Sequence, residues 1–146
     1  MKPQPPAAAL SLPESAGAGV AGVPVASAVF EPAVLGDMFN HEAALMASVL
    51  QTFVASMAAS LAEIERAMAG PDLHTVGLAA HRVKGACRMS GALAMGDAAQ
   101  ALETLAQAGS THATQQALQH LQWQWRALCA TLLRDGHVAA PDPFAP

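Results

Sequence analysis

Residues 73–91 read LHTVGLAAHRVKGACRMSG, and this stretch decides the fold because it carries a clear helical pattern of apolar residues. The pattern has spacings of three and four and consists of Leu73, Val76, Ala80, Val83 and Cys87. On a helix that turns about 100° per residue, these side chains form one stripe, and His81 lies about 120° from its centre. The sequence therefore predicts an amphipathic helix that buries the stripe and points His81 away from the core.

The surroundings of His81 combine a cation with two small residues. Lys84 follows three residues later and lies on the same helix face, where its ammonium group can reach an anion held on the imidazole. Gly77 and Gly85 lie one turn before and one turn after the histidine. A glycine inside a helix costs roughly 0.5–1 kcal/mol relative to alanine, so two of them beside one histidine indicate a surface kept clear for another protein.

The same stretch resembles the signature of histidine-containing phosphotransfer (HPt) domains, which are phosphorelay modules often found at the C-terminal end of hybrid sensor kinases. The matching positions are His81, Lys84, Gly85, Ala86, Gly91 and Ala92. The resemblance covers about residues 30–136, and its further matches are Phe30-Glu31-Pro32 and Leu102-Glu103.

The resemblance implies roles for individual residues. His81 would be the phosphoacceptor, Lys84 would stabilise the phosphate, and Gly85 would have to stay small so that a partner can approach. The family often has a polar residue near the position of Glu103 that orients the active histidine, and Gln100 lies on the same expected helix. The chain would carry phosphohistidine without an ATP site or cofactor of its own. The Mg²⁺ and the carboxylates for transfer would come from the receiver domain that it binds.

The expected function is therefore that of a phosphorelay intermediate in a two-component system. A neutral imidazole nitrogen is a competent nucleophile near neutral pH, and phosphoryl transfer depends mainly on positioning and charge stabilisation. His81 would accept the phosphoryl group from the aspartate of one receiver domain and pass it to the receiver domain of a response regulator. The expected source is a hybrid sensor kinase of the virulence-regulating type, and a free-standing carrier is the alternative.

A docking surface for receiver domains is expected around the histidine. The expected partner-binding residues are Gly77, Leu78, Arg82, Arg88, Met89 and Glu103. The two large apolar members project away from the core stripe, and clustered exposed apolar side chains can mark a docking surface. The two arginines are placed to meet acidic groups of a receiver domain. Single exposed apolar side chains and solvated helix charges are also common on ordinary surfaces.

The composition favours one all-α domain. The chain has 146 residues, 53% of them hydrophobic, which is enough for a single core. Aromatic residues make up only 4% and tyrosine is absent, whereas strands draw on aromatic and β-branched residues. The net charge of −4 and the total of 7 lysines and arginines argue against binding to nucleic acid.

Apolar periodicity and capping residues predict a short helix at 32–40 followed by four long helices. The second helix is expected to start at an N-cap on Asn40 and to end at Gly70, and the third to run from Pro71 and Asp72 to about Met89. The fourth covers about 93–108, and the fifth runs from Ser110 or Thr111 to Gly136. Short connections predict an antiparallel four-helix bundle, with the additional N-terminal helix packed across one end.

The two ends of the chain are expected to lie outside this bundle. Residues 1–29 are rich in proline, alanine and glycine and predict a flexible linker, and residues 137–146 predict a disordered tail. No continuous apolar run reaches the roughly 18 residues of a membrane helix, so direct membrane contact is not expected. Cys87 and Cys129 are expected to be buried thiols in a reducing compartment, and no metal site is expected. The predicted location is the cytoplasm, including the cytoplasmic part of an inner-membrane sensor kinase.

Two alternatives stay open on the sequence. One is the dimerisation and phosphoacceptor helix pair of a histidine kinase, which usually has an acidic residue directly after its histidine and a proline a few positions later. Here Arg82 follows His81, and no proline interrupts the helix. We expect a monomer, whereas that helix pair is an obligate dimer. The other alternative is a helical adaptor that binds a partner without chemistry.

Overall fold

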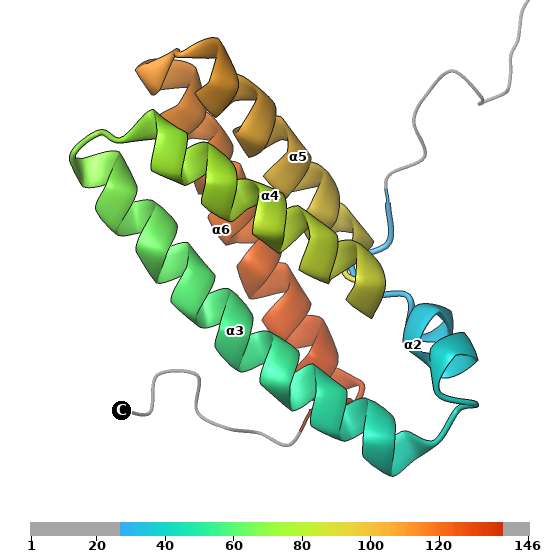
Figure 1. The fold of residues 1–146 in the computed structure, drawn as a ribbon. Helices are drawn as coiled ribbons and strands as arrows, with labels where there is room; N and C mark the ends of the chain where they lie inside the picture. The colour runs from blue at the N-terminus through green and yellow to red at the C-terminus, as the bar shows by residue number, and fades with distance from the viewer. Residues whose placement is uncertain (1–26, 139–146) are drawn as a thin grey trace, which may run out of the picture.

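The computed structural model describes residues 27–138, which form five α-helices and no strand (Figure 1). The helices are α2 (Pro32–Met38), α3 (Ala43–Ala69), α4 (Leu73–Ser90), α5 (Leu93–Ala108) and α6 (Thr111–Arg134). The four long helices run alternately up and down a bundle, and α2 lies at the end where α4 finishes. This architecture confirms the predicted all-α bundle with a short additional N-terminal helix.

Capping side chains and left-handed glycines set the ends of the helix that carries His81 and of its neighbours. The Asp72 carboxylate accepts a hydrogen bond from the Thr75 amide at 3.1 Å, and the Ser110 hydroxyl accepts one from the Ala113 amide at 3.2 Å. These contacts satisfy amides that have no partner in a first helical turn. Gly91 ends α4 at φ 93° and Gly109 ends α5 at φ 85°, a region that glycine enters without steric cost.

The start of α3 differs from the prediction that Asn40 is its N-cap. Asn40 and His41 both have positive φ, at 54° and 59°, and the His41 amide donates to the Gly36 carbonyl at 2.8 Å. These two residues form the turn that closes α2, so the N-cap of α3 moves to Glu42. At the other end of the bundle, α6 finishes at Arg134, before the expected Gly136.

The core lies between the four long helices. The predicted stripe on α4 is buried, with only Leu73 left at the edge. Large buried side chains from the other helices are Leu50 and Ile64 on α3, Met95 and Leu102 on α5, and Leu121, Leu128 and Leu132 on α6. The long helices pack closely on their neighbours along the chain, α3 on α4, α4 on α5 and α5 on α6, whereas α3 and α6 touch sparsely.

Residues just before α2 and just after α6 also contact the bundle, although the sequence predicts that they lie outside it. In the stretch expected as a linker, the Ala28 carbonyl accepts from the Ala94 amide at 2.9 Å, and Ser27 donates to Asp97. In the expected tail, the His137 amide donates to the Leu132 carbonyl at 2.9 Å, and Val138 is only 8% exposed. The rest of the predicted linker and tail, 1–26 and 139–146, lies outside the described residues.

Helix α3 is strongly apolar, although the sequence predicts no membrane-spanning helix. Among the described residues, this helix is long and apolar enough, by length and composition alone, to cross a membrane. A core helix of a water-soluble bundle meets the same criterion, and α3 buries Leu50, Phe53, Met57, Leu61, Ile64 and Met68. Most of its apolar window nevertheless lies outside the core.

Candidate functional site

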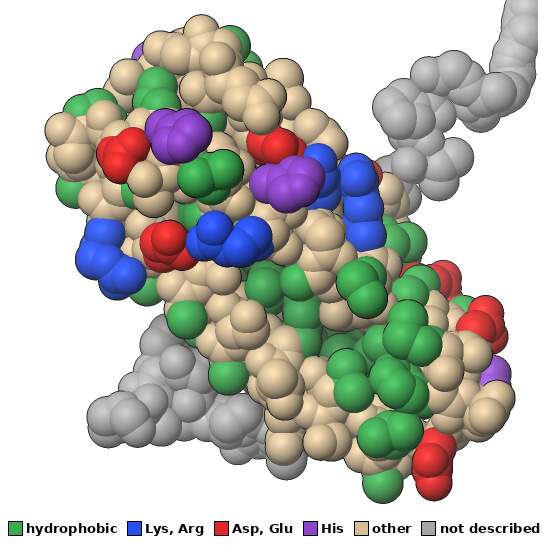
Figure 2. Space-filling model, in the orientation of Figure 1, with side chains coloured by type: hydrophobic (Ala, Val, Ile, Leu, Met, Phe, Trp, Pro, Cys, Tyr) green, Lys and Arg blue, Asp and Glu red, His purple; other side chains and the backbone are tan. Residues whose placement is uncertain are grey.

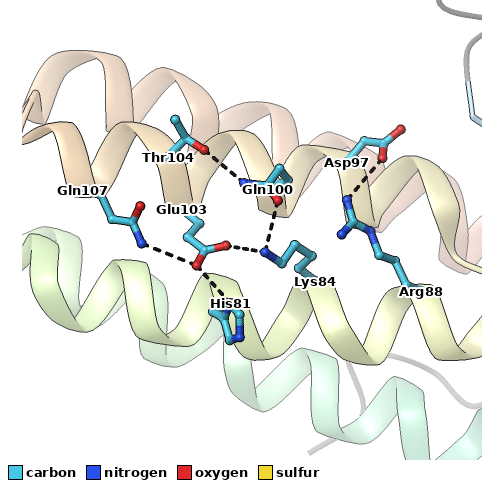
Figure 3. A network of polar contacts seen from close by, with 8 residues as sticks. All are labelled: His81, Lys84, Arg88, Asp97, Gln100, Glu103, Thr104 and Gln107. Atoms are coloured by element: carbon cyan, nitrogen blue, oxygen red, sulfur yellow. Dashed lines mark hydrogen bonds and ion pairs between the residues drawn. The ribbon is translucent and has the colours of Figure 1, made fainter.

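His81 lies on the outer face of α4, as the position of the apolar stripe predicts. Its side chain is 65% exposed, while the neighbouring Ala80 and Val83 are fully buried. The ring turns toward α5, where its Nδ1 atom lies 2.9 Å from Oε2 of Glu103 (Figure 3). The packing of α4 on α5 therefore gives an exposed imidazole one fixed polar partner.

The Glu103 carboxylate is buried and accepts several hydrogen bonds. Its residue is 8% exposed; Lys84 Nζ donates to Oε1 at 2.7 Å, and Gln107 Nε2 donates to Oε2 at 3.5 Å. The hydrogen bond from Lys84 lowers the pKa of this carboxyl, the contact with His81 lowers the pKa further, and burial acts in the opposite direction. Glu103 is therefore ionised at neutral pH.

The ionised carboxylate determines which nitrogen of the His81 ring carries the proton. A carboxylate has only acceptor atoms, so the 2.9 Å contact requires Nδ1–H as the donor. In a neutral ring the lone pair is then on Nε2. Within residues 27–138, Nε2 has no hydrogen-bond or ion-pair partner. The site thus presents one nucleophilic nitrogen at the surface.

Lys84 lies between α4 and α5 and is more buried than a typical surface lysine. Its side chain is 15% exposed, and besides Glu103 it donates to Oε1 of Gln100 at 3.0 Å. The Gln100 amide donates in turn to Thr104 at 3.0 Å. This network holds the ammonium group beside the His81 ring, and Lys84 has to share or leave Glu103 in order to contact an anion there.

Two members of the network, Thr104 and Gln107, are not among the site residues predicted from the sequence. Together with Gln100 and Glu103 they recur at spacings of three and four, which places them on one face of α5. A polar stripe on an otherwise apolar helix was the signal that could have found them.

The two glycines beside His81 have different environments. A Cβ atom built on Gly85 would meet nothing within 4 Å, so this position is open. Gly77 is buried, and a Cβ atom there would lie 3.8 Å from that of Ala106. Gly85 is therefore exposed to a partner, whereas α5 packs against Gly77.

The expected docking residues surround the histidine, but several are already engaged. Leu78 and Met89 are 52% and 64% exposed. Arg82 pairs with Glu63 of α3 at 2.6 Å, and Arg88 lies 3.9 Å from Asp97. Glu103 is largely buried and contacts His81 and Lys84.

A groove of about 400 Å³ adjoins the histidine between α4 and α5. It is lined by Leu73, His74, Gly77, Leu78, His81, Glu103, Ala106 and Gln107. On this face, Figure 2 shows histidine, basic and apolar side chains gathered close together. The groove gives a reactant or partner access to the ring.

Other groups with potential for metal or redox chemistry lie apart from this site. Between residues 27 and 138, no cluster of three or more histidine, cysteine or acidic side chains could hold a metal ion. Burial raises the pKa of the Cys87 thiol to about 12 and also raises that of Cys129. Both thiols are therefore protonated at neutral pH.

Comparison with known proteins identifies the family. The Hpt domain family matches residues 48–135, which is more than half of the chain and runs from α3 to the end of α6. No curated protein and no solved structure matches the chain. The matched range includes His81 and every residue of the network with Glu103. The chain belongs to the Hpt domain family.

Proposed function

We propose that this Hpt domain is a phosphorelay intermediate that carries the phosphoryl group on Nε2 of His81. Hpt domains have a phosphotransfer role in two-component phosphorelays and generally interact with receiver domains, and no kinase domain is detected in the chain. The observation that carries the proposal is the contact of Nδ1 with ionised Glu103, which leaves the Nε2 lone pair on an exposed ring.

The proposed step is attack of Nε2 on the phosphorus of an aspartyl phosphate. The N–P bond forms as the P–O bond to the aspartate breaks, and the aspartate leaves as a carboxylate. The ring keeps its proton on Nδ1 and becomes positively charged. Glu103 lies 2.9 Å from that proton and stabilises the new charge. Transfer to the next receiver domain reverses the same step.

Lys84 is proposed to neutralise part of the charge on the bound phosphoryl group. Its ammonium is already held next to the ring through Glu103 and Gln100, so only a small movement is needed. A bound phosphoryl group competes with Glu103 for this cation. Phosphorylation of His81 therefore changes the hydrogen bonds that Lys84 makes with α5.

The surface around Gly85 is proposed to receive the partner. The open space above Gly85 and the exposed side chains of Leu78 and Met89 leave room for a receiver domain. That domain is proposed to carry the Mg²⁺ and the acidic residues for transfer. A cytoplasmic location, a monomeric state and a parent hybrid sensor kinase stay predictions from the sequence and its resemblance to the family.

The test is phosphotransfer from receiver domains loaded with acetyl phosphate, with phosphoramidate as a second donor that needs no protein partner. Wild type is compared with His81→Gln, and His112→Gln serves as the matched control because His112 is exposed on α6. We expect label on the wild type and on the control but not on His81→Gln. Equal labelling of all three proteins would refute the proposal.

The labelling experiment and a mass measurement together test the alternatives left open by the sequence. A helical adaptor would take up no label from any donor. A dimerisation module would have twice the chain mass in analytical ultracentrifugation, whereas we expect the mass of one chain. Membership of the Hpt domain family favours the phosphorelay function over both alternatives.

A further inference from the structure

The outer face of α4 carries a stripe of four residues that runs past His81. Leu78, Arg82, Gly85 and Met89 recur at spacings of four, three and four, which places them along one side of the helix. The stripe is roughly 16 Å long at 1.5 Å per residue. Its two ends are exposed apolar side chains, and the space above Gly85 is open. Of these four residues only Arg82 is charged.

Acidic residues of the neighbouring helices offset the positive charge of α4. This helix has three lysine and arginine residues and no acidic residue, and each of the three cations has an acidic partner on α3 or α5. Figure 2 shows basic and acidic side chains close together beside the histidines of this face. The pairs are Arg82 with Glu63 at 2.6 Å, Lys84 with Glu103 at 2.7 Å, and Arg88 with Asp97 at 3.9 Å.

The pair of Arg82 with Glu63 matters most for a partner, because Arg82 lies inside the stripe. Complementary charge speeds the encounter of two proteins, and the receiver domain proposed above carries acidic residues at its own site. An unpaired Arg82 would attract such a domain. Glu63 cancels this attraction, since its carboxylate lies against the guanidinium. The rest of the stripe is apolar, and burial of apolar side chains stabilises a contact regardless of the partner's charge.

We propose, resting on the phosphorelay function above, that a receiver domain covers Leu78 and Met89 with apolar side chains, and that Glu63 keeps Arg82 from attracting acidic partners. Glu63 is then a specificity-determining residue on a helix that does not carry the histidine. It makes the choice of partner depend on the fit of an apolar surface and not on negative charge.

Transfer rates at low and high salt test the role of Glu63. Charges interact over about 30 Å at about 0.01 M salt but over only about 3 Å at about 1 M. The donor is a receiver domain of net negative charge, loaded with acetyl phosphate and used far below saturation so that the rate reports the encounter. We expect Glu63→Gln to accept phosphate roughly threefold faster than wild type at low salt and equally fast at high salt.

Glu65→Gln is the matched control for this charge. Glu65 lies on the same helix, but its carboxylate accepts a hydrogen bond from Gln122 of α6 at 2.7 Å and does not contact α4. The substitution removes the same charge from the chain, so the control separates the net charge from the charge beside Arg82. We expect Glu65→Gln to follow wild type at both salt concentrations.

Leu78→Ser and Met89→Ser test the apolar contacts. We expect each substitution to slow transfer from the receiver domain several-fold at both salt concentrations, because the lost contact is not electrostatic. Trp123→Ser is the control, since Trp123 is an exposed apolar residue on α6, and it should transfer like wild type.

The outcomes that would overturn the proposal differ from those that would refute the phosphorelay function. Equal rates of Glu63→Gln and wild type at low salt, or the same acceleration in Glu65→Gln, would remove the role of Glu63. Unchanged rates in Leu78→Ser and Met89→Ser would exclude apolar docking on the stripe. Phosphoramidate needs no docking surface and should label every variant, whereas a wild type that no donor labels would refute the function itself.

Discussion

His81 and Lys84 on α4 share the two oxygens of one carboxylate on α5: Nδ1 of His81 contacts Oε2 of Glu103 at 2.9 Å, and Lys84 Nζ contacts Oε1 at 2.7 Å. Glu103 therefore orients the ring and positions the cation at the same time (Figure 3). One buried negative charge sets the proton position on His81 and offsets the charge of Lys84.

Removal of the Glu103 carboxylate should change the tautomer of His81 and slow phosphotransfer. In Glu103→Ala, Nδ1–H loses its acceptor, and we expect a larger share of the ring to carry its proton on Nε2, which then has no lone pair. A hydrogen bond to a charged group contributes about 1.5–3 kcal/mol, so a loss of this size in the transition state slows transfer roughly tenfold or more. Nitrogen-15 NMR of the ring and a quenched time course measure the two effects.

Glu103→Gln is the matched variant for this prediction because it keeps the shape and removes the charge. We expect both tautomers to be present and the transfer rate to lie between those of wild type and Glu103→Ala. A wild-type ring protonated on Nε2, or equal tautomer populations in all three proteins, would contradict the assigned role.

The stabilising contribution of Glu103 should depend on pH. Its pKa in the folded chain is lowered from the ordinary value of 4.5, chiefly by the hydrogen bond from Lys84. Ionised Glu103 therefore stabilises the fold above about pH 4.5, and this contribution is lost as the pH falls through the lowered pKa. Urea unfolding of wild type and Glu103→Gln between pH 7 and pH 3 should show a difference that shrinks in acid. The pKa of Asp72 is also lowered, but Asp72 is present in both proteins, so its contribution cancels in the difference between their free energies of unfolding. A difference that does not change with pH would contradict the prediction.

Substitution of Gly85 should separate stability from phosphotransfer. A Cβ atom has open space there, so Gly85→Ala should stabilise the helix by about 0.5–1 kcal/mol. Gly85→Gln should also fold, but its side chain occupies the partner's approach and should slow transfer from a receiver domain. Phosphoramidate, which is small, should label Gly85→Gln at nearly the wild-type rate. If the receiver domain labels it equally fast, Gly85 has no part in access.

Gly91 should be much less tolerant of alanine than Gly109, although both have positive φ. A Cβ atom on Gly91 would collide with the backbone carbonyl of Glu31, whereas one on Gly109 would meet nothing within 4 Å. Strained φ alone costs on the order of 1–3 kcal/mol, and both variants bear that cost. We expect Gly91→Ala to lower the thermal midpoint further, because it also breaks the 2.8 Å hydrogen bond from the Glu31 amide to the Gly91 carbonyl. Equal midpoints would show that this connection adds nothing to stability.

The sequence predicted α4 and the exposure of His81 well, because both depend on local periodicity. The start of α3 was less predictable, since Asn40 is as suitable for a positive-φ turn as for an N-cap. The choice depends on the hydrogen bond from His41 to Gly36, which closes the turn. The sequence did not predict that residues 137–138 pack on the bundle, because their placement depends on contacts with Phe30 and Leu132.

By itself the sequence determined the helices, the buried stripe of α4 and the exposed position of His81, because the 3.6-residue period fixes which side chains share a face. The tertiary structure decided which groups meet that face. Glu103 is 22 positions from His81, and only the packing of α5 on α4 brings its carboxylate to Nδ1 and leaves Nε2 as the nucleophile. The same packing covers Gly77 and leaves Gly85 open, a difference that no local pattern contains because it arises from the distance between two helices.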